Sequence, residues 1–200
     1  MPDCIEKVIP ADILKAVRKN VSAGTFAHIM GSCALGAEIA CRYKLDKRKI
    51  ILAGILHDIA KDFSDSKKVQ YMRRYKIKKP DNPDLDVLLH GFIAAKITEK
   101  EFGIKDREII NAVKYHTTGK KKMNNTAKAL FAADYIEEGR THKGAARIRT
   151  IWRNDPEMTL DELVFDIISA KIRYVESVPK KVHENGIKLY NELIEKLNKK

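Results

Sequence analysis

The chain has 200 residues, of which 44% are hydrophobic, so it is long enough to bury a core and too apolar for a disordered protein. Lysine and arginine total 39 and aspartate and glutamate 27, and this surplus (39 − 27 = +12) favours polyanionic partners such as nucleic acid, anionic membranes or phosphate-rich small molecules. The longest apolar run, residues 50–56, is far shorter than the roughly 20 residues of a membrane span. The first ten residues lack the apolar core of a signal peptide. We therefore expect a cytoplasmic protein without a membrane association.

The three cysteines are Cys4, Cys33 and Cys41, and they form no CxxC pattern. An odd number without that spacing argues against a disulfide framework and against a cysteine zinc site. We interpret them as reduced thiols in a reducing compartment.

Helical periodicity recurs along the chain, whereas the alternation typical of strands is nearly absent. Thr25 is the expected cap of the second helix and Asp46 the expected cap of the third. The clearest turn signal is KPDNP at residues 79–83. Caps and breakers predict helices over residues 11–20, 25–43, 46–61, 64–75, 85–101, 106–116, 127–138, 159–177 and 179–197. The pattern predicts one all-α domain over residues 1–200, with a helical pair at about 157–197 packed on a core at about 25–140.

Two aspartates stand inside apolar sequence. Asp134 follows the segment ALFAA, and Asp58 ends the most apolar helix of the chain, directly after His57. Burying an isolated carboxylate costs several kcal/mol unless a partner compensates its charge. A lone helical histidine is more often structural than a metal ligand, but several histidines together with two such carboxylates indicate one shared cation. A metal centre would satisfy all of them.

The order of these residues resembles the HD-domain superfamily of metal-dependent phosphohydrolases. Its pattern of a His, a His-Asp pair and a distant Asp is matched by His28, His57, Asp58, His90, His116 and Asp134, where the two additional histidines fit the dinuclear branch. The segments YHTTG at 115–119 and ADYIEEGR at 133–140 are similar to the YqeK-type symmetrical bis(5'-nucleosyl)-tetraphosphatases. Glu138 departs from that family, which often has Pro there, and touches no ligand. The resemblance covers about residues 27–149 and implies an HD-domain helical bundle with additional C-terminal helices.

The resemblance also implies two divalent metal ions. The first would be held by His28, His57, Asp58 and Asp134, and the second by Asp58, His90 and His116, with Asp58 as the bridge. Nitrogen and oxygen donors without thiolate suit iron, manganese, nickel or zinc, and the family suggests iron.

Two cationic side chains are candidates for contacts with substrate phosphate. Lys61 lies three residues after Asp58, on the same face if the helix continues, and we interpret it as a phosphate contact or a stabiliser of transition-state charge. Arg140 has the planar group that binds phosphate oxygens in pairs. The plainer alternative for each is a surface cation.

The loop after the fourth histidine offers hydroxyl and backbone N–H groups to phosphate through Thr117, Thr118 and Gly119, although an ordinary helix-ending turn would look the same. His142 and His183 fall outside the ligand pattern, and we expect them to be exposed.

These residues predict an enzyme that cleaves diadenosine tetraphosphate symmetrically to two ADP through a metal-bridging water or hydroxide, with Asp58 and Lys61 as its catalytic residues. One alternative is an HD phosphohydrolase acting on a nucleoside monophosphate, a triphosphate or a cyclic nucleotide. A less favoured alternative is a non-catalytic nucleic-acid-binding helical module. The net charge permits that alternative, but no helix-turn-helix or aromatic platform supports it. The sequence does not indicate the oligomeric state.

Overall fold

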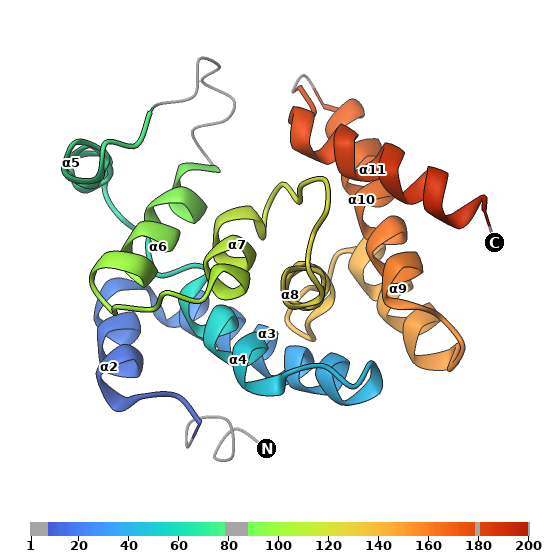
Figure 1. The fold of residues 1–200 in the computed structure, drawn as a ribbon, viewed down its shortest axis with the longest axis horizontal. Coiled ribbons are helices and arrows are strands. Elements are labelled where there is room, and N and C mark those ends of the chain that lie inside the picture. Colours follow the sequence, from blue (N-terminus) through green and yellow to red (C-terminus); the bar gives the residue numbers. More distant parts are fainter. Residues whose placement is uncertain (1–7, 79–87, 179–180, 200) are drawn as a thin grey trace.

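The computed structural model describes residues 8–78, 88–178 and 181–199, and these ranges contain ten α-helices and no strand (Figure 1). The predicted all-α class is therefore confirmed. The helices are α2 (Ala11–Asn20), α3 (Ala23–Arg42), α4 (Lys47–Leu56), α5 (Asp65–Tyr75), α6 (Leu89–Lys100), α7 (Arg107–Tyr115), α8 (Asn125–Ile136), α9 (Lys143–Asn154), α10 (Leu160–Glu176) and α11 (Glu184–Leu197). No helix in the described ranges combines the length and apolarity required to cross a membrane.

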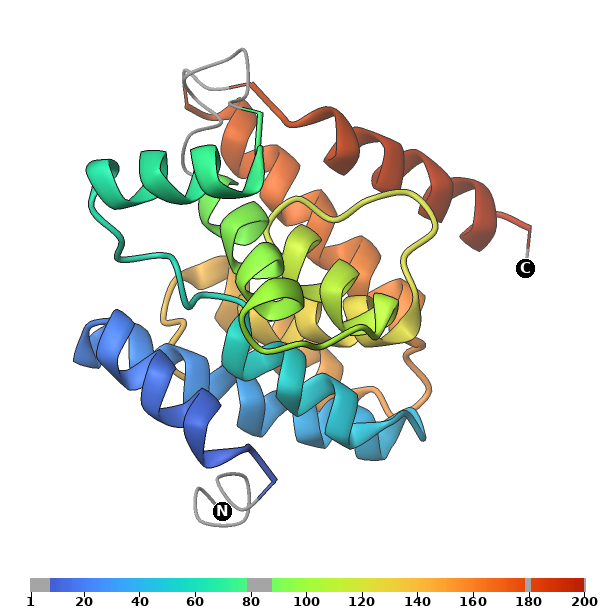
Figure 2. The same ribbon diagram turned by 60° about the vertical axis from the view of Figure 1, so that its left-hand side comes forward.

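Helix α8 lies at the centre of the fold, where it contacts α3, α4, α7, α9 and α10 (Figure 1). Its side chains are buried on every face from Thr126 to Asp134. The ammonium of Lys128 would be costly to bury alone, and it donates to Asp161 of α10 over 2.5 Å. Helices α10 and α11 pack against each other, and Figure 2 shows α11 at the outer edge of the molecule. The C-terminal helices are thus joined to the core through α8.

Several helix limits correct the sequence prediction. Helix α3 is capped by Ser22, whose hydroxyl accepts a hydrogen bond from the N–H of Thr25, so Thr25 lies inside the helix. Helix α4 begins after Asp46 as predicted but ends at Leu56 rather than near Lys61. The turn that follows is tighter than an α-helix, because the N–H of Lys61 donates to the carbonyl of Asp58, three rather than four residues back. His57 and Asp58 are therefore held at a helix end.

Other predicted limits differ at helix starts. Helix α6 begins at Leu89 and α11 at Glu184, whereas the sequence suggested starts near 85 and 179. Those two predicted positions, the turn at 79–83 and Cys4 lie outside the described residues. Helix α8 begins at Asn125, capped by Asn124, two residues before the predicted start.

Helix α9 was missed by the sequence prediction. Its apolar residues Ala145, Ile148 and Trp152 are buried at helical spacing, and its N-cap is His142, whose Nδ1 accepts the N–H of Ala145. Histidine is not among the usual caps, so the start of this helix carried no ordinary signal. His183 caps α11 in the same way. His142 is exposed as expected, whereas His183 is half-buried.

Helices α3 and α4 approach closely at Gly54, where a Cβ atom would lie 2.9 Å from Cys33 Sγ. We expect Gly54→Ala to lower the free energy of unfolding by about 1–3 kcal/mol, the usual cost of overpacking a core. The control is Gly24→Ala in the first turn of α3, where a Cβ would meet nothing within 4 Å. That change should raise the free energy of unfolding by about 0.4–1 kcal/mol. Urea unfolding followed by circular dichroism measures both, and a Gly54→Ala chain as stable as the wild type would contradict the close approach.

Candidate metal centre

The six predicted ligands converge from five helices or their ends. His28 lies on α3, His57 and Asp58 follow the last residue of α4, His90 lies on α6, His116 follows the last residue of α7, and Asp134 lies on α8. His28 is nearly buried and the other five are buried. His57 and His116 are the C-caps of α4 and α7, and both imidazoles are buried in the interior.

The first ligand group comprises His28, His57, Asp58 and Asp134. His28 Nε2 lies 2.9 Å from Asp134 Oδ1 and 3.5 Å from Asp58 Oδ2. His57 Nε2 lies 3.4 Å from Asp58 Oδ2 and 3.7 Å from Asp134 Oδ1. Two ring nitrogens and two carboxylate oxygens thus surround one small space.

The second ligand group comprises Asp58, His90 and His116. The other oxygen of Asp58, Oδ1, lies 3.2 Å from His90 Nε2 and 3.4 Å from His116 Nε2. The two ring nitrogens are 3.0 Å apart. Each oxygen of Asp58 therefore faces a different set of histidines, which is the arrangement of a bridging carboxylate.

Hydrogen bonds on the far side of two rings fix the position of a proton. His57 Nδ1 donates to the Gly54 carbonyl over 2.6 Å, and His116 Nδ1 donates to the Val113 carbonyl over 2.7 Å. Since a carbonyl only accepts, each Nδ1 carries hydrogen, and Nε2 of the neutral ring presents its lone pair to the cluster. His57 Nε2 and Asp58 Oδ1 are buried and have no hydrogen-bond partner among the described residues. Nitrogen and oxygen donors left in this way fit a metal cation.

The electrostatics of the cluster also favour added positive charge. Burial lowers the pKa of His57, but the carboxylates of Asp58 and Asp134 outweigh it and raise that pKa above its ordinary value. Burial opposes ionisation of the two aspartates, yet the facing histidines hold each pKa well below the usual range. Burial lowers the pKa of His116 to about 4. Ionised carboxylates beside a neutral imidazole are the protonation states that bind metal.

The family model of the HD domain matches residues 25–139, which is more than half of the chain and contains all six residues. The chain belongs to the HD-domain family. It is 34% identical over 184 residues to the symmetrical bis(5'-nucleosyl)-tetraphosphatase of Staphylococcus aureus, covering 92% of this chain and 90% of that protein. It is 29% identical over 182 residues to the protein of the same name from Halalkalibacterium halodurans, covering 90% and 95%.

A solved structure has the same fold. It is the crystal structure of a predicted HD superfamily hydrolase involved in NAD metabolism from Clostridium acetobutylicum, with a TM-score of 0.82 and 27% sequence identity. The match covers 92% of this chain and 96% of that chain, so it extends well beyond the residues matched by the HD-domain model.

Glu137 contacts His28 on the side of the ring that faces away from the centre, and the sequence prediction missed it. Its side chain is buried, with Oε1 3.0 Å from His28 Nδ1 and Oε2 accepting the N–H of Gly139. A carboxylate behind a metal-binding histidine fixes the proton on the far nitrogen and makes the near one a stronger ligand. Arg149 of α9 holds this turn, because its Nη1 donates to the carbonyls of Ile136 and Glu137 over 2.8 and 2.7 Å. The only sequence signal was the position of Glu137 within the segment ADYIEEGR.

The two predicted phosphate-binding cations both lie against the centre. Lys61 Nζ donates to Asp58 Oδ2 over 2.6 Å. Arg140 Nη2 donates to Asp134 Oδ1 over 3.0 Å and lies 3.1 Å from His28 Nε2. Their side chains keep 37% and 35% of their surface exposed, so each also faces solvent beside the ligands.

The loop after α7 brings one hydroxyl to the centre. Thr117 Oγ1 lies 2.9 Å from His116 Nε2. The Thr118 hydroxyl donates to the Gly119 carbonyl, and the Gly119 N–H donates to the Tyr115 carbonyl, so both polar groups bond within the loop. Gly119 has a φ of +64°, and a Cβ there would collide with Leu189 of α11. Helix α11 therefore covers this loop.

Lys171 of α10 reaches the same loop and was also missed by the sequence prediction. Its Nζ donates to the Thr117 carbonyl over 2.9 Å and lies 4.3 Å from the centre of the Phe131 ring. Burial lowers the pKa of Lys171 to about 8, although Asp134 opposes the shift. A lysine on a remote helix has no local pattern that marks it as part of a site.

The Glu137 contact makes a prediction about metal affinity. We expect Glu137→Gln to weaken binding of a divalent metal by about 10- to 100-fold, since His28 loses the charged partner that orients its ring. The control is Glu138→Gln, an exposed carboxylate that pairs with Arg149 and Arg153, for which the affinity should stay within about twofold. Titration of Mn²⁺ against a competing chelator measures both variants. Equal affinities would show that Glu137 does not support the centre.

Proposed function

We propose that this protein is a metal-dependent phosphohydrolase that cleaves diadenosine tetraphosphate symmetrically into two molecules of ADP. The observation that carries the proposal is the buried carboxylate of Asp58, whose two oxygens face two sets of histidines. The two bacterial relatives named as symmetrical bis(5'-nucleosyl)-tetraphosphatases match over nine-tenths of the chain, which supports the choice of substrate.

We assign the metals to the two ligand groups. One divalent ion would be held by His28, His57, Asp58 and Asp134, and a second by Asp58, His90 and His116. Iron is the expected metal, and manganese, nickel and zinc suit the same nitrogen and oxygen donors. When bound, such ions polarise phosphoryl oxygens and make water a stronger nucleophile at neutral pH.

The side chains around the ligands would bind and orient the substrate. Lys61 uses one N–H on Asp58, and its remaining N–H groups can stabilise charge that develops on a phosphoryl oxygen. The planar guanidinium of Arg140 can donate paired hydrogen bonds to a phosphate of the tetraphosphate chain. Thr117 presents its hydroxyl beside His116, with Thr118 and Gly119 shaping the loop.

The products of the reaction test the proposal. Protein supplied with Fe²⁺ or Mn²⁺ should convert diadenosine tetraphosphate to ADP alone, separated by chromatography, and elemental analysis should find about two metals per chain. Asp58→Ala should abolish turnover and remove most of the metal, with the helical circular dichroism signal retained. ATP together with AMP would mean asymmetric cleavage. Turnover of only mononucleotides or cyclic nucleotides would place the chain among the other HD phosphohydrolases.

Lys171 makes a separate prediction about substrate placement. Lys171→Met removes the donor to the Thr117 carbonyl, so we expect kcat/KM to fall by about tenfold or more, the scale of one charge-assisted hydrogen bond. Metal content should not fall, because Lys171 hydrogen-bonds the loop and acts on Asp134 only through its positive charge, whose removal does not oppose a bound cation. Lys188→Met on α11, where the lysine pairs with exposed Glu184, is the control. Unchanged kcat/KM in Lys171→Met would show that the loop is held without it.

A further inference from the structure

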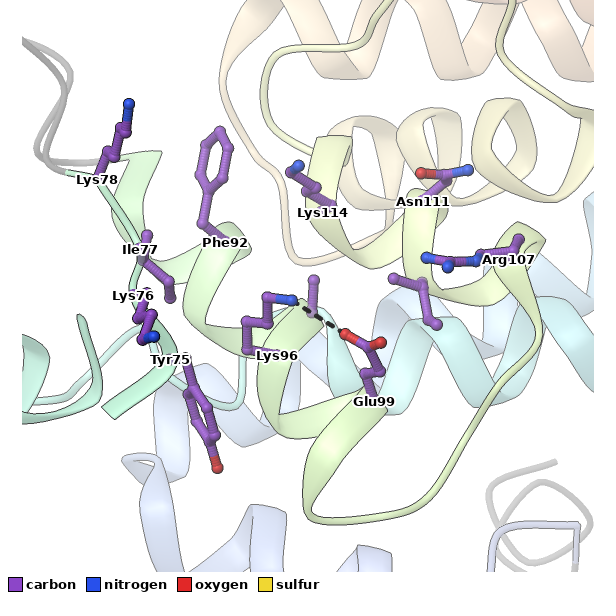
Figure 3. A pocket seen from close by; sticks show the side chains of 12 residues that line it. Tyr75, Lys76, Ile77, Lys78, Phe92, Lys96, Glu99, Arg107, Asn111 and Lys114 are labelled. Atoms are coloured by element: carbon purple, nitrogen blue, oxygen red, sulfur yellow. Dashed lines mark hydrogen bonds and ion pairs between the residues drawn. The ribbon is translucent and has the colours of Figure 1, made fainter. Parts of the chain in front are cut away.

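A pocket of about 370 Å³ lies between α6, α7 and residues 75–78 (Figure 3). Its volume falls in the range of about 300–1,000 Å³ that is usual for small-molecule sites. A second hollow of about 280 Å³ shares Tyr75, Lys76 and Lys96 with it and continues toward Arg74 and Lys100. We call the two together the α6–α7 groove.

The α6–α7 groove is strongly positive. The main pocket is lined by five cations, Lys76, Lys78, Lys96, Arg107 and Lys114, and by one carboxylate, Glu99. That carboxylate is already bonded, since it accepts from Lys96 over 3.1 Å and lies 3.5 Å from Lys100. The other four lining cations form no ion pair with any described carboxylate, so their charges are left for a ligand.

The walls of the groove also include apolar and aromatic groups. The half-buried ring of Phe92 lines the pocket, and Lys114 Nζ lies 5.2 Å from its centre (Figure 3). Tyr75, Ile77 and Ile110 complete this part of the lining. A simple anion would use only the lysines and Arg107. A ligand with both phosphates and a flat ring would use the aromatic and apolar walls as well.

The groove lies on helix faces turned away from the metal centre. Along α6 its lining residues are Phe92, Ala95, Lys96 and Glu99, whose spacing places them on one face. His90 is two positions from Phe92, about 200° around the helix at 3.6 residues per turn. On α7 the lining residues are 107, 110, 111 and 114, and the last of them is likewise two positions, about 200°, from His116. None of the six ligands lines the groove, so it is separate from the metal centre.

We propose that the α6–α7 groove binds a nucleotide that carries two or more phosphates, at a site distinct from the metal centre. The phosphates would contact Arg107, Lys114, Lys76 and Lys78, and the base would lie against Phe92. The volume of about 370 Å³ is on the scale of one small-molecule ligand. An occupant would contact α6 and α7 together, the two helices that supply His90 and His116 to the second ligand group.

Calorimetric titration with ATP, at 150 mM salt and with a chelator present, tests this site. We expect Arg107→Glu combined with Lys114→Glu to weaken ATP binding by at least about tenfold. The control is Lys47→Glu combined with Arg48→Glu, which changes the net charge equally at exposed positions of α4 that lie outside the groove and form no ion pair with a described carboxylate. The control should bind within about twofold of the wild type at this salt concentration. Asp58→Ala should also retain the binding, so that loss of the proposed hydrolysis and loss of this site can be told apart.

Several results would overturn the proposal. If the groove variant binds ATP as tightly as the control does, or if Asp58→Ala abolishes the binding, ATP binds elsewhere. Inorganic tripolyphosphate that binds as tightly as ATP would show that no base is recognised. A single-stranded oligonucleotide that binds more tightly than ATP would make the groove a nucleic-acid surface. If circular dichroism shows that the double reversal unfolds the chain, Arg107→Gln and Lys114→Gln singly must each still weaken ATP binding.

Discussion

The burial of one carboxylate, that of Asp58, is the constraint on which the arrangement of the surrounding helices depends. Asp58 is almost completely buried, and each of its oxygens faces imidazole nitrogens from different helices. Such a group is stable only if compensating charge is brought to it, because its desolvation costs several kcal/mol. Histidines on four helices or at their ends supply that compensation, from α3, α4, α6 and α7.

A second layer of contacts fixes the rings that surround this carboxylate. The carbonyls of Gly54 and Val113 hold His57 and His116, and Glu137 holds His28. Each contact commits the far nitrogen of its ring and leaves the near one for the centre. The orientation of these rings therefore depends on backbone carbonyls and on Glu137 as well as on the six named side chains.

Much of this could be predicted from the sequence. The order of histidines and aspartates identifies the family because those residue types are rare in apolar segments, and Asp46 marks the start of α4 because it is an ordinary cap. Helix α9 could not be recognised, since its cap is His142 and arginines interrupt its narrow apolar stripe. Glu137 and Lys171 were missed for another reason. Whether a charged side chain is buried depends on helices that are far away in the sequence. The local sequence pattern around the residue does not indicate which helices these are.

The residues of the two ligand groups and the residues that contact the loop after α7 lie in different parts of the chain. Every residue of the two ligand groups precedes position 135, whereas the contacts that fix the loop come from Lys171 and Leu189. During synthesis these six residues leave the ribosome before Lys171 and Leu189, which contact the loop, have emerged. A nascent chain of this kind presents both ligand groups before it presents the side chains that cover the loop after α7. The order of the chain thus separates the residues of the centre from the residues that fix the neighbouring loop.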